Sequence, residues 1–143
     1  MKILIDTNVL IDYITQRAPY STDAEKIMIL CKDKWINGYV ASLSIMNIFY
    51  ILRKKMTVEK QKKFWLALLD YIEVVGIDRK KIINVLTDQL FTDIEDCLQA
   101  ECAKAFSADY IVTRNIRDFQ NSPIPAILPD EFLRTVKMKT EKN

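Results

Sequence analysis

Acidic side chains occur at three widely separated places in the sequence, each next to a segment with the pattern of a strand or helix. Asp6 directly follows the apolar run 2–5, Asp96 lies in TDIEDCLQA, and Asp118 lies in YIVTRNIRDF. In an open parallel sheet the carboxyl ends of the strands meet at one edge, so we expect these carboxylates to converge there. Crowded carboxylates repel one another strongly unless they take up protons or bind a cation.

The residue types around these acids favour a hard divalent cation. The sequence has no histidine, which excludes imidazole zinc sites and nucleophiles activated by histidine. Oxygen ligands select Mg²⁺ or Mn²⁺, which bind phosphates and lower the pKa of bound water, as phosphodiester cleavage requires. The only glycines, Gly38 and Gly76, cannot form a P-loop or a dinucleotide fingerprint, so ATP and NAD are poor candidates.

Helix capping is the competing explanation for two of these acidic segments. Asp6 alone fits the N-cap of a helix that begins at Thr7. Thr92 with Glu95 fits a capping box, and Asp93 is another candidate cap for the same helix. In isolation, both segments are explained by capping.

Capping leaves Asp96 unexplained. Asp96, Ala100 and Ala103 share one helical stripe, so the carboxylate tops a small-residue face that can pack close to a sheet. Asp118 has a structural explanation of its own, a polar turn closed by its side chain. Three acidic segments meeting at one edge favour a metal site over three separate structural roles.

Short β-like runs alternate with longer helical patterns, which predicts a parallel sheet with crossover helices. The expected strands are 2–5, 38–42, 72–77 and 109–113, with a short fifth near 126–128. The expected helices are 6–14, 21–34, 44–54, 57–71, 79–90, 93–106 and 130–136. In 57–71 we expect Phe64, Leu66, Leu68 and Tyr71 to form the apolar face.

Length and composition predict one domain. The chain has 143 residues, half of them hydrophobic, which allows one sizeable core. We expect a single domain over 1–135 and a polar, frayed tail over 136–143. No apolar run approaches the roughly 20 residues that cross a bilayer, and Cys31, Cys97 and Cys102 suit buried, reduced thiols, so we expect a cytoplasmic protein.

The motifs ILIDTNVLIDY, DIEDCLQA and TRNIRDF, in this order, resemble the PIN-domain family of metal-dependent ribonucleases. The likeness spans nearly the whole chain and is strongest for the small VapC-like toxins of type II toxin–antitoxin pairs. It implies a three-layer α/β/α sandwich around a four- or five-stranded, mainly parallel sheet. It also implies an endoribonuclease, a Mg²⁺ or Mn²⁺ cofactor, an antitoxin partner and a homodimer.

The resemblance assigns roles to particular residues. The metal ligands and catalytic residues would be Asp6, Asp96 and Asp118, with Asp93 as an additional candidate ligand. Supporting or water-positioning roles would fall to Asn8, Asn47, Thr113 and Asn115. Asn47 stands where the family usually has a glutamate, which leaves a non-catalytic or weakly active PIN-like binding module as the alternative function. A phosphatase acting on a small substrate is a weaker third possibility.

A basic segment indicates a nucleic-acid partner. Residues 53–63 hold six Lys or Arg against one Glu, and phosphate contacts of this kind give sequence-independent affinity. A solvated surface is the competing explanation. We take Arg53, Lys54, Lys55 and Arg114 as candidate contacts to single-stranded or looped RNA, with Trp35, Trp65 and Tyr20 as possible stacking residues. Tyr13, Tyr20, Ile27 and Met28 suggest an apolar surface for a homodimer or an antitoxin.

Overall fold

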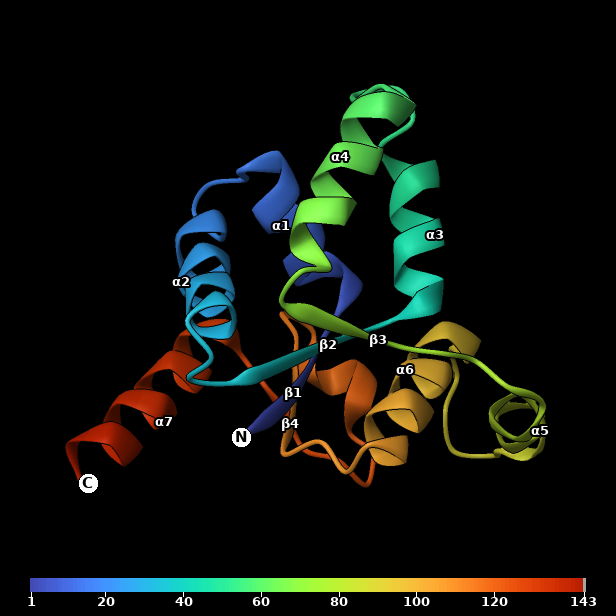
Figure 1. Ribbon diagram of the computed structural model, residues 1–143. Coiled ribbons are helices and arrows are strands. Elements are labelled where there is room, and N and C mark those ends of the chain that lie inside the picture. The colour runs from blue at the N-terminus through green and yellow to red at the C-terminus, as the bar shows by residue number, and fades with distance from the viewer. Residues whose placement is uncertain (143) are drawn as a thin grey trace.

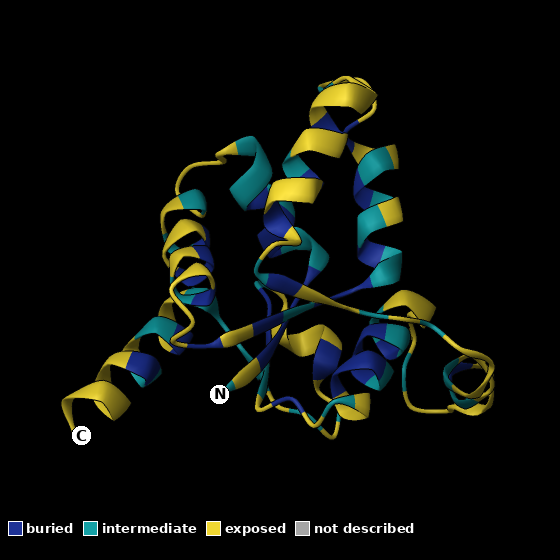
Figure 2. Ribbon diagram, viewed as in Figure 1, coloured by how far each residue is buried: buried dark blue, intermediate teal, exposed yellow. Residues whose placement is uncertain are grey.

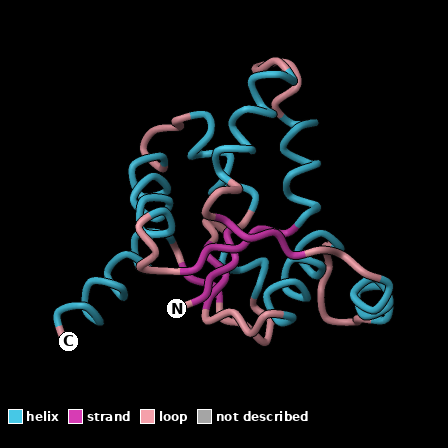
Figure 3. Tube along the Cα trace, viewed as in Figure 1, coloured by secondary structure: helices cyan, strands magenta, loops and turns pink. Residues whose placement is uncertain are grey.

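The computed structural model describes residues 1–142 and places a parallel β-sheet at the centre of the chain (Figures 1 and 3). Its five strands are β1 (Lys2–Ile5), β2 (Asn37–Ala41), β3 (Ile72–Val75), β4 (Tyr110–Val112) and β5 (Ala126–Ile127). The order across the sheet is β3-β2-β1-β4-β5, and every neighbouring pair is parallel. The predicted strand set is confirmed, with ends that differ by one or two residues.

Helices cover both faces of the sheet (Figure 1). They are α1 (Thr7–Thr15), α2 (Ser21–Lys32), α3 (Ser42–Ile51), α4 (Val58–Leu68), α5 (Arg79–Thr87), α6 (Ile94–Ala105), the 3₁₀ turn η1 (Ile116–Phe119) and α7 (Pro129–Glu141). One face carries α1 to α4, and the other carries α6 with α5 packed against it. This arrangement confirms the expected three-layer α/β/α sandwich.

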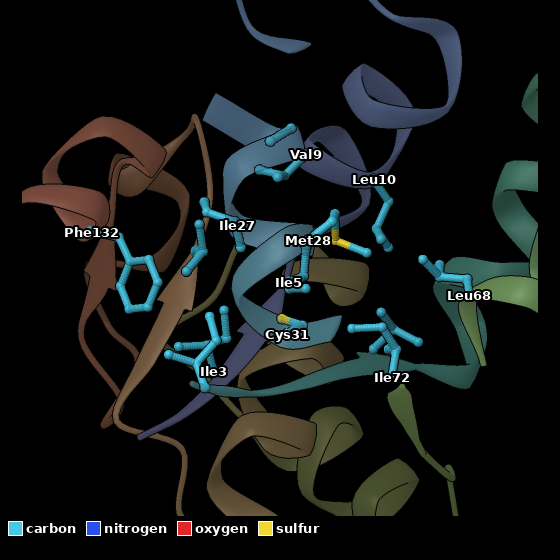
Figure 4. Close-up of a cluster of buried hydrophobic side chains, with 14 of the residues drawn as sticks. Ile3, Ile5, Val9, Leu10, Ile27, Met28, Cys31, Leu68, Ile72 and Phe132 are labelled. Carbon is cyan, nitrogen blue, oxygen red and sulfur yellow. The ribbon is translucent and has the colours of Figure 1, made fainter. Parts of the chain in front are cut away.

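Alternate residues of β1 serve two hydrophobic cores, because successive side chains of a strand point to opposite faces. Ile3 and Ile5 pack with helices α1, α2 and α4, among side chains such as Leu10, Met28 and Leu68 (Figure 4). Leu4 points the other way, toward α6 and η1. Buried residues line both sides of the strands, while the outer helix faces are exposed (Figure 2).

The α2 helix packs unusually close to β2. A Cβ atom added at Gly38 would lie 2.7 Å from Cys31 Sγ and 2.7 Å from Ile72 Cδ1. Any larger residue at position 38 would therefore require the Cys31 and Ile72 side chains to move. Ile27 and Met28, which we expected at a partner surface, are 0% and 2% exposed in the same core, so that expectation is wrong.

The buried face of α4 differs from the predicted one. Gln61, Trp65 and Leu68 are buried, whereas Leu66 is 70% exposed. Position 66 lies about 100° around the helix from Trp65, which turns it away from the core. Trp65 is thus a core residue and is not available to stack on bases.

The last helix runs further than predicted. Residues 136–141 belong to α7, whereas we expected a frayed tail from 136; the remainder of that tail includes residue 143, which lies outside the described residues. Val136 is buried, and Lys137 pairs with Glu141 at 3.9 Å, one turn later. α7 begins at Pro129, one residue before the predicted start, and proline is favoured in the first turn of a helix. Across residues 1–142, no helix combines the length and the hydrophobicity needed to span a bilayer.

Candidate active site at the carboxyl edge of the sheet

The register of β1 and β4 brings Asp6 beside Thr113. Ile5 pairs with Val112, and the Asp6 amide donates to the Val112 carbonyl at 3.0 Å. Each strand ends at this point, so the next residue of each projects from the sheet edge. Thr113 Oγ1 donates to Asp6 Oδ2 at 2.8 Å, and both side chains are buried.

Asp6 is a helix cap and also the centre of a buried polar network. Its Oδ1 accepts the Thr7 amide at 2.8 Å, which makes it the N-cap of α1 as predicted. The same oxygen accepts Gln99 Nε2 at 3.3 Å. These contacts, with that from Thr113, hold the carboxylate in one orientation.

The start of α6 supplies the second acid. Asp93 is its N-cap, because Asp93 Oδ1 accepts the Asp96 amide at 3.0 Å. The alternative of a capping box from Thr92 and Glu95 is therefore wrong. Ala100 and Ala103 are buried against the sheet, which places Asp96 at the top of the small-residue stripe, as predicted.

The third acid, Asp118, lies on the exposed turn η1. Burial is the main cause that raises the pKa of Asp6, and the charges of Glu95 and Asp118 raise it further. Against the hydrogen bonds from Thr113 and Thr7, which lower it, the pKa of Asp6 rises to about 6. The charge of Asp118 therefore acts on Asp6. Segments far apart in the sequence thus meet at this edge.

Asp96 is the carboxylate most affected by its neighbours. Burial is again the first cause, followed by the charges of Asp93, Asp118, Asp6 and Glu95, and together they raise its pKa to about 7. We call Asp6, Asp96 and Asp118 the acidic site. None of the salt bridges formed by the described residues involves a member of the acidic site. Negative charge there is therefore not compensated by a Lys or Arg.

The carboxylates are close enough for their charges to affect one another, but they do not surround a common point. Within residues 1–142, no three acidic or cysteine side chains converge tightly enough to enclose an ion. Asp6 is fixed by hydrogen bonds, whereas Asp96 is half-buried and Asp118 is exposed. The two accessible side chains are the ones able to turn.

Gln99 is a site residue that the sequence analysis missed. It is 1% exposed, and its Nε2 donates to Ser44 Oγ at 2.8 Å and Thr7 Oγ1 at 3.1 Å, besides Asp6. Its Oε1 is buried with no hydrogen-bond partner among the described atoms. A glutamine three residues after Asp96, on a stripe of alanines, was the available signal, because buried amides need polar partners.

The residues expected to support the acids lie where predicted in part. Asn8 Nδ2 lies 3.5 Å from Thr113 Oγ1, and Asn8 Oδ1 accepts the Arg114 amide at 3.5 Å. The Asn115 amide donates to Thr113 Oγ1 at 3.0 Å, but the Asn115 side chain is exposed and makes no such contact. Asn47 Nδ2 donates to Glu95 Oε1 at 3.0 Å, on the α3 side of the acidic site.

A buried ion pair beside the acidic site was also missed. Asp12, 1% exposed, accepts Arg114 Nε at 2.6 Å and Arg114 Nη2 at 3.3 Å. The guanidinium also lies 4.2 Å from the centre of the Tyr20 ring. Arg114, a candidate RNA contact, therefore has its charge engaged by Asp12.

The basic segment forms the tip of the α3–α4 hairpin, which projects from the sheet (Figure 1). Lys54 and Lys55 are exposed there, just beyond the end of α3, a helix about 15 Å long. Arg53 donates to the Tyr50 carbonyl at 2.7 Å and lies 3.9 Å from the centre of its ring. The two lysines are the freer cations of this group.

Comparison with solved structures shows the same fold in chains of distant sequence. A toxin–antitoxin complex from Klebsiella pneumoniae matches with TM-score 0.68 and 19% identity over 89% of this chain and 97% of that chain. VapBC2 from Rickettsia felis, bound to a DNA fragment from its promoter, gives TM-score 0.65 and 20% identity over 90% and 98%. FitAB bound to an IR36 DNA fragment gives 0.60 and 16% over 89% and 94%.

The sequence itself identifies the family. None of the curated proteins matches it significantly. The profile of the PIN domain matches residues 2–117, which include β1 to β4 and all but one residue of the acidic site. The missing residue, Asp118, directly follows the matched range. This chain belongs to the PIN domain family.

Proposed function

We propose that this protein is a metal-dependent endoribonuclease and the toxin of a toxin–antitoxin pair. One observation carries the proposal. The acidic site gathers carboxylates from β1, α6 and η1, and no cationic side chain of the described residues pairs with them. The family match and the neighbouring toxin–antitoxin folds support the same conclusion.

The residues present fit a Mg²⁺ or Mn²⁺ ion. The donors are carboxylate oxygens, which such ions prefer. Gln99 adds a buried, unpartnered Oε1 beside Asp6, so the network retains an unused acceptor. Asp6, Asp96 and Asp118 would hold the ion, with Asp93 as an additional candidate whose Oδ1 already caps α6. When bound, the ion would polarise the scissile phosphate and lower the pKa of an attacking water.

The protein contributes orientation and charge to this site. Thr113, the Thr7 amide and Gln99 hold Asp6 still, which gives a fixed ligand on a buried scaffold. To bind the same ion as Asp6, Asp96 and Asp118 would have to turn their accessible side chains toward Asp6. Asn8 supports Thr113 from the α1 side. The exposed side chain of Asn115, two residues after Thr113, is our candidate for orienting water or phosphate.

RNA is the proposed substrate because the exposed lysines at the hairpin tip offer phosphate contacts without groove readout. We also propose an antitoxin partner and a homodimer. Support comes from exposed apolar side chains on several helices, which a second chain would shield: Met46, Tyr50, Ile51, Leu66, Leu86 and Ile94. The Klebsiella neighbour is by description a toxin–antitoxin complex.

The experiment compares cleavage of an end-labelled single-stranded RNA by the wild-type chain, with Mn²⁺ and with EDTA. We expect cleavage that EDTA abolishes and that Asp6→Asn and Asp96→Asn eliminate. Glu101→Gln is the matched control, because Glu101 lies on α6 but bonds to Asn84 at 3.0 Å on the α5 side. Wild-type protein that binds RNA without cutting it contradicts the nuclease and favours a binding module. Preferential hydrolysis of p-nitrophenyl phosphate favours a phosphatase.

A further inference from the structure

Two side-chain hydrogen bonds join α3 to α6 beside the acidic site. Gln99 Nε2 donates to Ser44 Oγ at 2.8 Å, and Asn47 Nδ2 donates to Glu95 Oε1 at 3.0 Å. Residues three or four apart lie on the same side of a helix. Both pairs therefore come from the faces that α3 and α6 turn toward each other. The hydrogen bond from Asn47 fixes the position of Glu95.

Glu95 is an exposed residue in the first turn of α6, where its charge suits the helix N-terminus, but that role does not require its contact with Asn47. Asp93 caps α6, and none of the described salt bridges includes Glu95. Asn47 occupies only Oε1, and Oε2 accepts no hydrogen bond from the described residues. The Glu95 charge nevertheless acts on both Asp6 and Asp96. A carboxylate is thus held at the edge of the acidic site with one oxygen unengaged.

We propose that Glu95 is a fourth carboxylate ligand of the metal site and that Asn47 is its positioning residue. This inference rests on the proposed function, because it concerns the same ion. An amide donor suits position 47, since a carboxylate there would face Glu95 with like charge at hydrogen-bonding distance. Hydrogen bonds that orient a ligand typically change metal affinity by about 10- to 100-fold.

The test measures Mn²⁺ binding to the full chain by isothermal titration calorimetry, with free Mn²⁺ followed by electron paramagnetic resonance. Glu95→Gln keeps the size and the capacity to bond while removing the charge. We expect it to weaken Mn²⁺ binding at least about tenfold, and Asn47→Ala to weaken it about tenfold. The metal-free melting temperature of both variants should stay close to that of the wild type.

Glu101→Gln is the matched control. It removes a carboxylate from the same helix, with the same 3.0 Å asparagine contact, but away from the acidic site. Its Mn²⁺ affinity should equal that of the wild type. If Glu95→Gln also binds like the wild type while Asp6→Asn does not bind, this inference is overturned and the proposed function stands. If the wild-type chain binds no Mn²⁺, both are overturned.

Discussion

Thr113 donates its hydroxyl to Asp6 Oδ2 at 2.8 Å, across two neighbouring strands whose ends lie in register. The contact stabilises the ionised carboxylate and partly offsets the cost of its burial. It therefore limits how far burial raises the pKa of Asp6.

Replacing that hydroxyl should raise the pKa of Asp6 and lower the free energy of unfolding at pH values above that pKa. Thr113→Val leaves a buried carboxylate without a donor, which costs about 1–3 kcal/mol of unfolding free energy at pH 8. Urea denaturation in EDTA measures this loss. Thr113→Ser retains the hydroxyl and should stay near the wild type; an equal loss in both variants would show that side-chain packing at position 113, and not the hydrogen bond, causes the effect.

The metal-free protein should become less stable as the pH rises through the acidic site's titration. The folded pKa values of Asp6 and Asp96, about 6 and about 7, exceed the unfolded value of 3.8. Between about pH 4 and pH 7 the folded state therefore holds more protons than the unfolded state, so the unfolding free energy falls with pH. For Asp6 the fall is up to about 3 kcal/mol.

Asp6→Asn isolates this effect. The variant has no proton to lose at that position, so its stability should depend less on pH than that of the wild type. Thermal melts in EDTA from pH 4.5 to pH 8 measure the difference between the two chains. Parallel curves for wild type and variant would show that Asp6 ionises normally in the folded state.

The Asp12–Arg114 pair should be a major stabilising contact. Asp12→Ala leaves the partly buried guanidinium without its partner, and breaking a buried pair costs about 3–5 kcal/mol. Asp130→Ala is the control, because its pair with Arg134 is exposed and is worth about 0–1 kcal/mol. Chemical denaturation of the two variants compares them. Similar losses would mean that burial adds nothing to the Asp12 pair.

The lysines at the hairpin tip should contribute sequence-independent RNA affinity. Lys54→Ala with Lys55→Ala should weaken binding of a single-stranded RNA in EDTA and reduce its salt dependence by about 0.7 in log–log slope per lost contact. Fluorescence anisotropy at several salt concentrations measures this. Lys137→Ala with Lys139→Ala, on α7, is the matched control, and an equal loss there would indicate non-specific attraction only.

The sequence was sufficient to predict which residues end neighbouring strands, because local patterns fix where strands end. Asp6 follows an apolar run and Thr113 ends another, so a parallel sheet must bring them to one edge. The stripe of Ala100 and Ala103 likewise predicted how Asp96 faces the sheet. These inferences need only the period of each element and the topology of the fold.

Contacts between distant side chains were beyond the sequence. Arg114 meets Asp12 from 102 residues away, and Gln99 meets Asp6 from 93 residues away. The stripe of alanines marks Gln99 as a candidate buried residue, but no local pattern shows which distant polar group Gln99 or Arg114 contacts. On α4 the prediction was wrong for Leu66, which is exposed, whereas Leu68 is buried and Phe64 packs against the core; tertiary packing selects the stripe that contains Trp65.

The proposed metal site is tested most directly in a crystal of the wild-type protein soaked in MnCl₂, with anomalous diffraction recorded near the manganese edge. We expect an anomalous peak within coordination distance of carboxylate oxygens of Asp6, Asp96 and Asp118, about 2.0–2.3 Å away. The peak should vanish in Asp6→Asn crystals. A wild-type map with no peak at these carboxylates, or with manganese only elsewhere, would contradict the proposed metal site.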